Sequence, residues 1–260
     1  MNVWIRRLAA ALPWLAVAVV SSGLVLVVLL PAAWVTPQLA RATQGRVDLI
    51  DASGSLWRGS AALMLAAGSA DAGPAAVLPG RIEWNTAFWP LLSGRVRLRL
   101  RHTDAMIDPV TIEASLNGAT ASPGAITLPA ALLSGLGAPF NTLDLQGDVR
   151  VRWTQWHWIR GNAFGGLTVT LDDMVSRVSR VKPLGSYRVA VQAQGAASTL
   201  DLSTLKGPLL LSGHGTIARQ GTSFHGEANA TPEARDNLVG LLNLLGQRTA
   251  TGTVTLDYMR

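Results

Sequence analysis

The clearest periodic pattern in the chain is GRVRLRLRH, residues 94–102. Val96, Leu98 and Leu100 occupy alternate positions, and arginines occupy the positions between them. Successive side chains of a β-strand point to opposite faces, so this pattern predicts a half-buried antiparallel strand whose apolar side packs on a core. At least one sheet therefore lies at the centre of the expected fold.

Weaker alternations of the same period recur along the chain. We expect a hairpin from residues 46–51 and 55–65, joined by a turn at 52–54. The Gly- and Pro-containing segment 66–80 is expected to be a long exposed loop. Further strands are expected over residues 81–84, 106–116, 143–153, 161–171, 186–193, 198–202, 207–218, 223–230 and 251–258. The resulting fold class is all-β dominated, with one or two antiparallel sheets and a few short helices.

Two segments carry helix signals. Residues 129–136 begin with a proline, which is favoured at the first helical position. In residues 231–246, Thr231 is the expected N-cap, leucines repeat on one face, and Gly246 is the expected C-cap. Residues 172–181 fit either a strand or a short helix.

An uncharged apolar run, Leu8–Leu30, precedes all of these elements. A bilayer core about 30 Å thick needs roughly 20 apolar residues in a helix, so this run is long enough to span a membrane. Arg6 and Arg7 lie before it, and the first basic residue after it is Arg41. Because flanking positive charge stays cytoplasmic, we expect the bulk of the chain outside the inner membrane.

The expected organisation therefore has four parts: a cytoplasmic N-terminus (residues 1–7), a transmembrane helix (8–30), a juxtamembrane linker (31–45) and a periplasmic β-rich domain (46–260). A cleaved signal peptide is the alternative. The apolar region of a signal peptide is usually only about 7–15 residues, which favours the uncleaved anchor.

Composition excludes several kinds of site. The 260 residues include no Cys, which excludes disulfides, thiolate catalysis and zinc–thiolate sites. Charged residues make up 15% of the chain and glycines number 26, as in a β-rich extracytoplasmic domain. Two of the six net positive charges come from Arg6 and Arg7, so the domain is only mildly basic. We therefore expect no nucleic-acid binding.

The polar side of residues 94–102 forms an arginine stripe, made of Arg95, Arg97, Arg99 and Arg101. Guanidinium groups on one face can hold an acidic partner or lipid phosphates through paired hydrogen bonds. The other interpretation is a solvated outer strand whose charge prevents aggregation. In that case Asp104, Asp108 and Glu113, in or just before the next strand, would neutralise the stripe.

Aromatic and histidine residues give little sign of catalysis. Trp153, Trp156 and Trp158 are expected mainly in the core, with a partner-binding anchor as the alternative. The histidines are His102, His157, His214 and His225, and we expect them in turns or at the surface. His214 and His225 can approach across a hairpin, but two ligands without nearby carboxylates make a poor metal site. The chain has no Gly-x-Ser-x-Gly motif and no paired carboxylates, so we expect no enzyme, cofactor or metal.

Several short motifs, in their order along the chain, resemble protein N of the type II (general) secretion pathway in Gram-negative bacteria. The most specific is Gly54-Ser55-Leu56-Trp57-Arg58-Gly59. The others are Pro183-Leu184-Gly185-Ser186-Tyr187, the leucine helix of residues 231–246, and residues 251–256. The resemblance implies one inner-membrane helix, a periplasmic β-rich domain and an accessory role without catalytic residues. More distantly, the layout looks like AsmA-type envelope proteins, whose curved sheets hold lipid.

The expected function is a non-enzymatic scaffolding subunit of type II secretion that acts by protein–protein contacts. Its expected partners are other inner-membrane secretion subunits, together with membrane lipid around residues 8–30. No small-molecule substrate is expected. The alternative is an envelope protein that holds or passes lipid along a curved sheet. The candidate partner-binding residues are Trp57, Arg58, Arg95, Arg97, Arg99 and Arg101.

Overall fold

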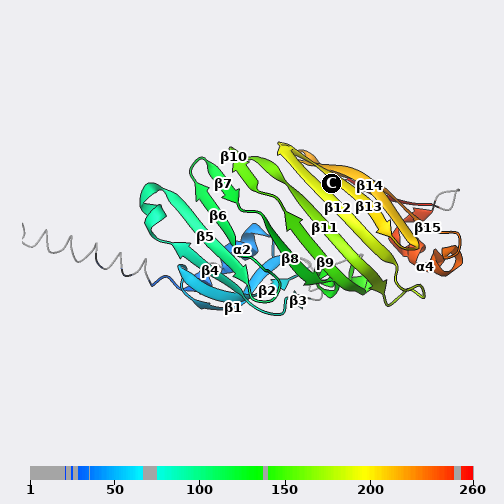
Figure 1. Cartoon of the computed structure of the whole chain (residues 1–260), viewed down its shortest axis with the longest axis horizontal. Coiled ribbons are helices and arrows are strands. Elements are labelled where there is room, and N and C mark those ends of the chain that lie inside the picture. Colours follow the sequence, from blue (N-terminus) through cyan, green and yellow to red (C-terminus); the bar gives the residue numbers. More distant parts are fainter. Residues whose placement is uncertain are drawn as a thin grey trace, which may run out of the picture.

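The structure, a computed structural model, describes residues 21, 25, 29–34, 36–66, 75–136, 140–248 and 253–259. In this part of the chain, seventeen strands form one sheet, and all strand pairs are antiparallel (Figure 1). The strands are β1 (Val47–Gly54), β2 (Arg58–Leu65), β3 (Ala76–Val77), β4 (Ile82–Ala87), β5 (Arg95–His102), β6 (Val110–Ser115), β7 (Gly118–Ala121), β8 (Gly124–Pro129), β9 (Leu145–Trp153), β10 (Trp156–Ile159), β11 (Asn162–Ser176), β12 (Gly185–Gly195), β13 (Ala197–Lys206), β14 (Leu209–Ala218), β15 (Gly221–Ala230), β16 (Gln247–Arg248) and β17 (Val254–Met259). The helical segments are η1 (Ala32–Trp34), α2 (Thr36–Ala42), η2 (Trp89–Ser93), η3 (Ala130–Leu136), α3 (Phe140–Leu143) and α4 (Arg235–Leu245). The predicted fold class is therefore confirmed for the domain.

The sheet is a meander in which strands close in sequence pair with each other. β1 pairs with β2, β2 with β3 and β4, and the chain continues through β5 and β6 to β7. The pairs β7–β10 and β8–β9 share one offset, with Ala121 opposite Trp156 and Gly124 opposite Trp153. They are thus two halves of one long, interrupted hairpin. From β11 the meander runs to β15, then to β17 and β16.

The two faces of the sheet differ in chemistry. Leu100 of β5 lies opposite Trp84 of β4 and Val110 of β6, so the apolar positions of neighbouring strands fall in register. We call this the inner face, because helices α2 and α4 both pack on it. The arginines of β5 occupy the alternate positions and lie on the opposite, outer face. The strand predicted over residues 94–102 is therefore confirmed, with its predicted orientation.

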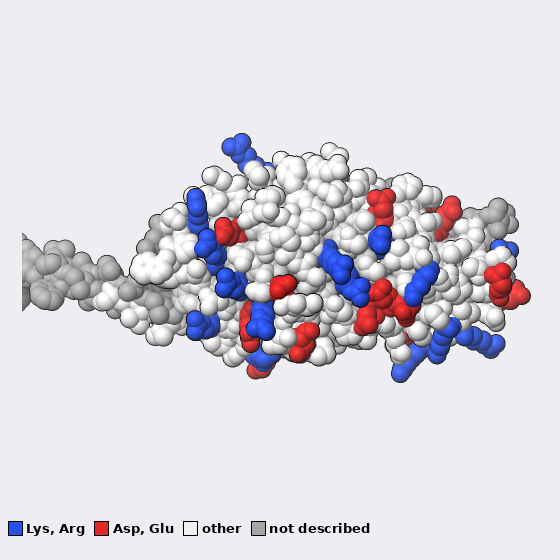
Figure 2. All heavy atoms as spheres, in the orientation of Figure 1, with Lys and Arg blue, Asp and Glu red and all other residues white. Residues whose placement is uncertain are grey.

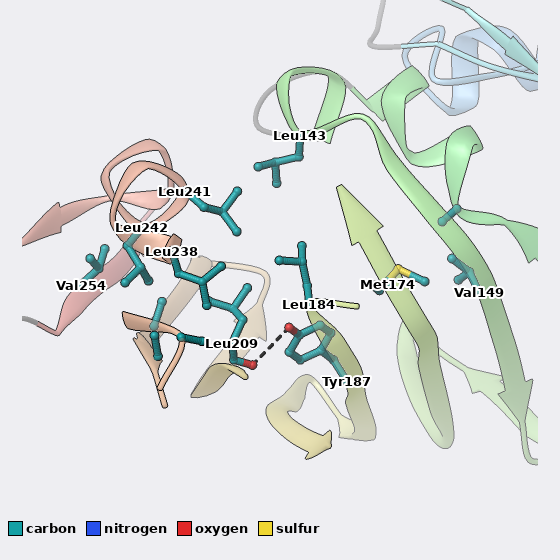
Figure 3. Packing of buried hydrophobic residues seen from close by; sticks show 14 residues of the cluster. Leu143, Val149, Met174, Leu184, Tyr187, Leu209, Leu238, Leu241, Leu242 and Val254 are labelled. Carbon is teal, nitrogen blue, oxygen red and sulfur yellow. Dashed lines mark hydrogen bonds between the residues drawn. The ribbon is translucent and has the colours of Figure 1, made fainter. Parts of the chain in front are cut away.

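The main core lies on the inner face toward the C-terminal end of the sheet. Leu238, Leu241 and Leu242 of α4 are buried in one cluster with Leu209 of β14 and Val254 of β17. Figure 3 shows these side chains pointing toward one another from the helix and the strands beneath it. The apolar side chains of α4 therefore pack against the last strands of the sheet and complete this core.

The buried phenol of Tyr187, on β12, belongs to the same core. It donates a hydrogen bond to the carbonyl of Leu209 at 3.1 Å (Figure 3). Burial raises the pKa of Tyr187 above its usual value. Leu184, Gly185 and Ser186, the neighbours of Tyr187 in the Pro183–Tyr187 motif, are buried as well. This motif therefore serves packing within the sheet.

Of the two predicted boundaries of the last helix, the start is wrong and the end at Gly246 is confirmed. Helix α4 begins at Arg235, with Ala234 at the N-cap. A separate turn precedes it: the N–H of Thr231 donates to the carbonyl of Pro208 at 2.9 Å, and the carbonyl of Thr231 accepts from the N–H of Ala234 at 3.1 Å. Gly246 does end the helix, but its φ of 175° is an extended conformation. A side chain on Gly246 would meet the carbonyl of Thr255, so close approach to β17 is the reason for a glycine here.

Other predicted segments change in detail. Residues 130–136 form the 3₁₀ helix η3, and Pro129 belongs to strand β8 before it. The ambiguous segment 172–181 continues strand β11 as far as Ser176. The predicted turn at 52–54 lies slightly later, since β1 extends to Gly54. Most of the predicted loop 66–80 lies outside the described residues.

The predicted transmembrane run Leu8–Leu30 also lies mostly outside the described residues. Within the part of the chain that the structure describes, no helix has both the length and the apolar character needed to cross a membrane. The membrane anchor therefore stays a prediction.

Candidate functional site

The hexapeptide of residues 54–59 forms the turn between β1 and β2. Gly54 has a φ of +88°, a left-handed conformation in which side chains are strained. The N–H of Ser55 donates to the carbonyl of Arg58 at 2.9 Å and closes the turn. A side chain on Gly59 would collide with the ring of Trp84. Gly54 therefore permits the tight turn, and Gly59 permits the close approach of the backbone to the ring of Trp84.

This turn sends Trp57 and Arg58 to opposite faces of the sheet. The ring of Trp57 lies edge-on to that of Phe88, with ring centroids 5.4 Å apart, and helps to line a cavity on the inner face. Arg58 lines a hollow on the outer face together with Arg99 and Arg101. The candidate partner-binding residues therefore divide between two surfaces of different chemistry.

The outer surface is a basic hollow of about 680 Å³ across β2, β4 and β5. Its geometry follows from the strand register, since Arg58 lies opposite Asn85 and Asn85 lies opposite Arg99. Arg101 lies opposite Glu83, which also lines the hollow. Antiparallel pairing thus brings an arginine of the hexapeptide into one row with the arginine stripe.

Most of these arginines have no carboxylate partner in the described part of the chain. Arg97 Nε donates to Glu113 Oε1 at 2.7 Å, so one of the three acids expected to neutralise the stripe does pair with it. Figure 2 shows a row of basic side chains across one end of this face, with few acidic side chains beside it. Among the candidate partner-binding residues, four arginines make no ion pair within 4.0 Å to a described carboxylate: Arg58, Arg95, Arg99 and Arg101.

Part of the predicted tryptophan core is exposed beside this region. The ring N–H groups of Trp153 and Trp156 donate to the carbonyls of Ser122 at 2.9 Å and Gly166 at 3.3 Å, and both side chains are partly buried. Trp158, however, is 57% exposed and lines a hollow of about 350 Å³ that also includes Arg95. The core prediction is therefore wrong for Trp158.

On the inner face, Trp57 lines a cavity of about 430 Å³ between helix α2 and the first strands. We call this cavity the apolar groove. Thr86 is the only hydroxyl-bearing residue among its lining residues, and none of them is charged. Its lining residues are Leu39, Leu49, Leu56, Trp57, Leu63, Ile82, Trp84, Thr86, Leu91, Val96, Leu98 and Leu100.

One histidine departs from the expected surface position. His102 is fully buried at the end of β5, and its Nδ1 accepts from the backbone N–H groups of Asp104 and Ala105 at 3.3 and 3.1 Å. Burial lowers the pKa of His102, while the nearby carboxylate of Asp104 acts in the opposite direction. The sequence did carry this signal, since residue 102 continues the inward positions 96, 98 and 100.

His214 and His225 do approach each other on the outer face, as predicted. They lie directly opposite each other on β14 and β15, with ring centroids 6.1 Å apart. The expectation that no carboxylate lies nearby is wrong, because His225 Nδ1 pairs with Asp257 Oδ1 and Asp201 lies opposite His214. Within the described residues, no group of three or more such side chains is placed to hold a metal ion.

Comparison with known proteins identifies the family. A family model for protein N of the type II secretion system matches residues 45–257, which cover the whole sheet apart from its last residues. No curated protein and no solved structure gives a significant match. The matched segment includes the hexapeptide turn, the basic hollow and the apolar groove except for Leu39. The chain therefore belongs to the type II secretion system protein N family.

Proposed function

We propose that this secretion component is a non-enzymatic scaffolding subunit of the inner membrane, and that its outer face binds acidic surfaces of other secretion subunits. Residues 8–30 would anchor it, with the sheet in the periplasm. The asymmetry of basic residues around that run supports this orientation.

The basic hollow is the observation that carries the proposal. Arg58, Arg99 and Arg101 line it together, and none of them makes an ion pair with a described carboxylate. Guanidinium groups bind carboxylates through two parallel hydrogen bonds, so such a row favours an acidic protein surface. Complementary charge of this kind raises association rates and specificity more than raw affinity.

Exposed apolar groups near the same end of the sheet would add affinity. Trp158 and Ile159 are 57% and 50% exposed, and both line the hollow that includes Arg95. Interface hot spots are enriched in tryptophan and arginine. The register places Ile159 on the outer face with Arg95, whereas Trp158 lies opposite Ala119 and shares the inner face with Val96. The outer surface therefore combines a row of guanidinium groups with one exposed apolar side chain.

The test is co-purification of the tagged full-length chain with the other inner-membrane secretion subunits from detergent-solubilised membranes. We compare the double variant Arg99→Glu, Arg101→Glu with the single variant Arg188→Glu, a charge reversal outside the basic hollow. Arg188 is exposed on β12 and also makes no ion pair with a described carboxylate, but it does not line the basic hollow.

We expect the double variant to lose most of the captured subunits, and the control to keep them. Raising the salt concentration should weaken capture by the wild-type chain, because exposed charge pairs are screened. Equal capture by all three proteins at every salt concentration would refute binding through the basic hollow.

A further inference from the structure

The apolar groove has no evident role in binding an acidic partner. It lies on the inner face, whereas the basic hollow lies on the outer face. Its volume of about 430 Å³ lies within the range of roughly 300–1,000 Å³ that is typical of small-molecule sites. The groove therefore has room for a ligand of its own.

The lining of the groove selects an apolar ligand. Two of its polar groups are engaged by the protein backbone: the ring N–H of Trp84 donates to the carbonyl of Ser55, and the hydroxyl of Thr86 to that of Leu56, both at 3.1 Å. A peptide or sugar would bring polar groups into a site with few partners for them, and buried polar groups without partners are unfavourable. A hydrocarbon chain has no polar groups that need hydrogen-bond partners.

The size of the groove fits a single hydrocarbon chain. At ~30 Å³ for each water molecule in the liquid, the volume corresponds to about fourteen waters. A methylene group occupies about as much space as a water molecule, so one extended or bent acyl chain of membrane-lipid length would fill it. Two chains, or a helix, would not fit.

The groove also lies beside the end of the apolar run Leu8–Leu30. The N–H of Leu56, a lining residue, donates to the carbonyl of Leu30 at 2.9 Å, and Pro31 forms a β-bridge with Ser55. In Figure 1 the turn between β4 and β5 lies at this same end of the molecule. If residues 8–30 span the bilayer, the groove is therefore close to its surface.

Exposed tryptophans mark the same end of the sheet. Trp34 in η1 is 64% exposed, and Trp89 in η2 is 78% exposed. η2 packs against β5, and the ring of Phe88 connects Trp89 to Trp57 in the groove through edge-on contacts. Tryptophan is enriched at membrane–water interfaces, where its amphipathic ring is favoured.

We propose that the apolar groove holds one acyl chain of a membrane phospholipid while the headgroup stays at the bilayer surface. This inference rests on the proposed membrane anchor. The second apolar cavity of the inner face contrasts with the groove. It measures about 140 Å³ and lies within the core under α4, where it is too small for the same ligand.

The test uses phosphatidylethanolamine with a diazirine in one acyl chain, incorporated into vesicles with the full-length protein. After irradiation, mass spectrometry locates the cross-linked peptides. We expect lipid adducts on β2, β4 and β5 in addition to adducts on residues 8–30. The variant Leu98→Trp would fill the groove and should lower the groove adducts at least tenfold.

Two further variants keep the test decisive. Arg188→Trp places the same ring on the outer face of β12, away from both the groove and the basic hollow, and should leave the groove adducts unchanged. Val96→Glu puts a charge at the half-exposed rim of the groove and should also lower them, which matters if Leu98→Trp fails to fold by circular dichroism.

The outcomes separate this inference from the proposal on which it rests. Adducts confined to residues 8–30 would overturn the acyl-chain site but leave the anchor intact. An absence of adducts on residues 8–30 would instead contradict the anchor. Groove adducts that persist equally in Leu98→Trp and Val96→Glu, with both variants folded, would also overturn the acyl-chain site.

Discussion

Replacing the buried Leu238 of helix α4 with alanine should destabilise the fold far more than replacing the exposed Leu244 of the same helix. The side chain is 0% exposed and lies in the main core, whereas Leu244 on the same helix is 54% exposed. Leu238→Ala removes three buried carbon groups at about 0.8 kcal/mol each, or about 2.4 kcal/mol. The cavity left behind raises the expected loss to about 3–5 kcal/mol, because the surrounding strands can close it only in part.

The assay is urea unfolding of the purified full-length chain in detergent, followed by far-ultraviolet circular dichroism. Tryptophan fluorescence is the wrong probe, because the chain has no tryptophan after Trp158 and α4 lies far beyond it. Leu244→Ala should change the free energy of unfolding by less than about 0.5 kcal/mol, as expected at an exposed position. Equal losses in the two variants would refute the description of α4 as the element that seals the C-terminal core.

Three further predictions concern single residues. The pKa of His102 is lowered in the folded state, so as the pH falls the unfolded state takes up the proton first. Stability should therefore fall as the pH drops below about 6.5. His102→Asn keeps a hydrogen-bond acceptor but cannot titrate, so it should remove that part of the pH dependence of the urea midpoint. Gly240 lies inside α4 with open space around it, so Gly240→Ala should raise stability by about 0.5–1 kcal/mol; a lower urea midpoint would contradict this. Tyr187→Phe removes the hydrogen bond to the carbonyl of Leu209 and should cost about 1 kcal/mol, measured by thermal unfolding, where an unchanged midpoint would argue against the bond.

Local alternation explains why much of the sheet could be predicted from the sequence. In β5, each second residue from Val96 to Leu100 lies on the inner face, and the register with β4 and β6 keeps this order. Period-two alternation is set within a single strand, so it requires no knowledge of distant partners. The same parity should have predicted the burial of His102, which lies two residues after Leu100.

Features that depend on distant strands could not be predicted in this way. Asp257 reaches His225 only because β17 returns to pair with β15 after helix α4. The start of α4 lies later than Thr231, whose N–H is bonded to the carbonyl of Pro208, just before β14. Each of these outcomes depends on a partner more than twenty residues away in the sequence.

The candidate site contains features that the sequence predicts and features that depend on distant parts of the chain. The opposite orientation of Trp57 and Arg58 follows from their adjacency in a strand-like segment. The basic hollow needs the register across β2, β4 and β5, and the apolar groove needs helix α2 to pack over the inner face. The sequence identified the residues, but the surfaces arise from strand pairing and helix packing.

The orientation of the domain is the central claim, and the absence of native Cys makes it directly measurable. Leu116, in the turn between β6 and β7, is 99% exposed, so Leu116→Cys provides a single accessible thiol. In cells with a permeabilised outer membrane, we expect a membrane-impermeant maleimide to label Leu116→Cys at once and Asn2→Cys only after the inner membrane is opened. Labelling of Leu116→Cys only after the inner membrane is opened would contradict the account.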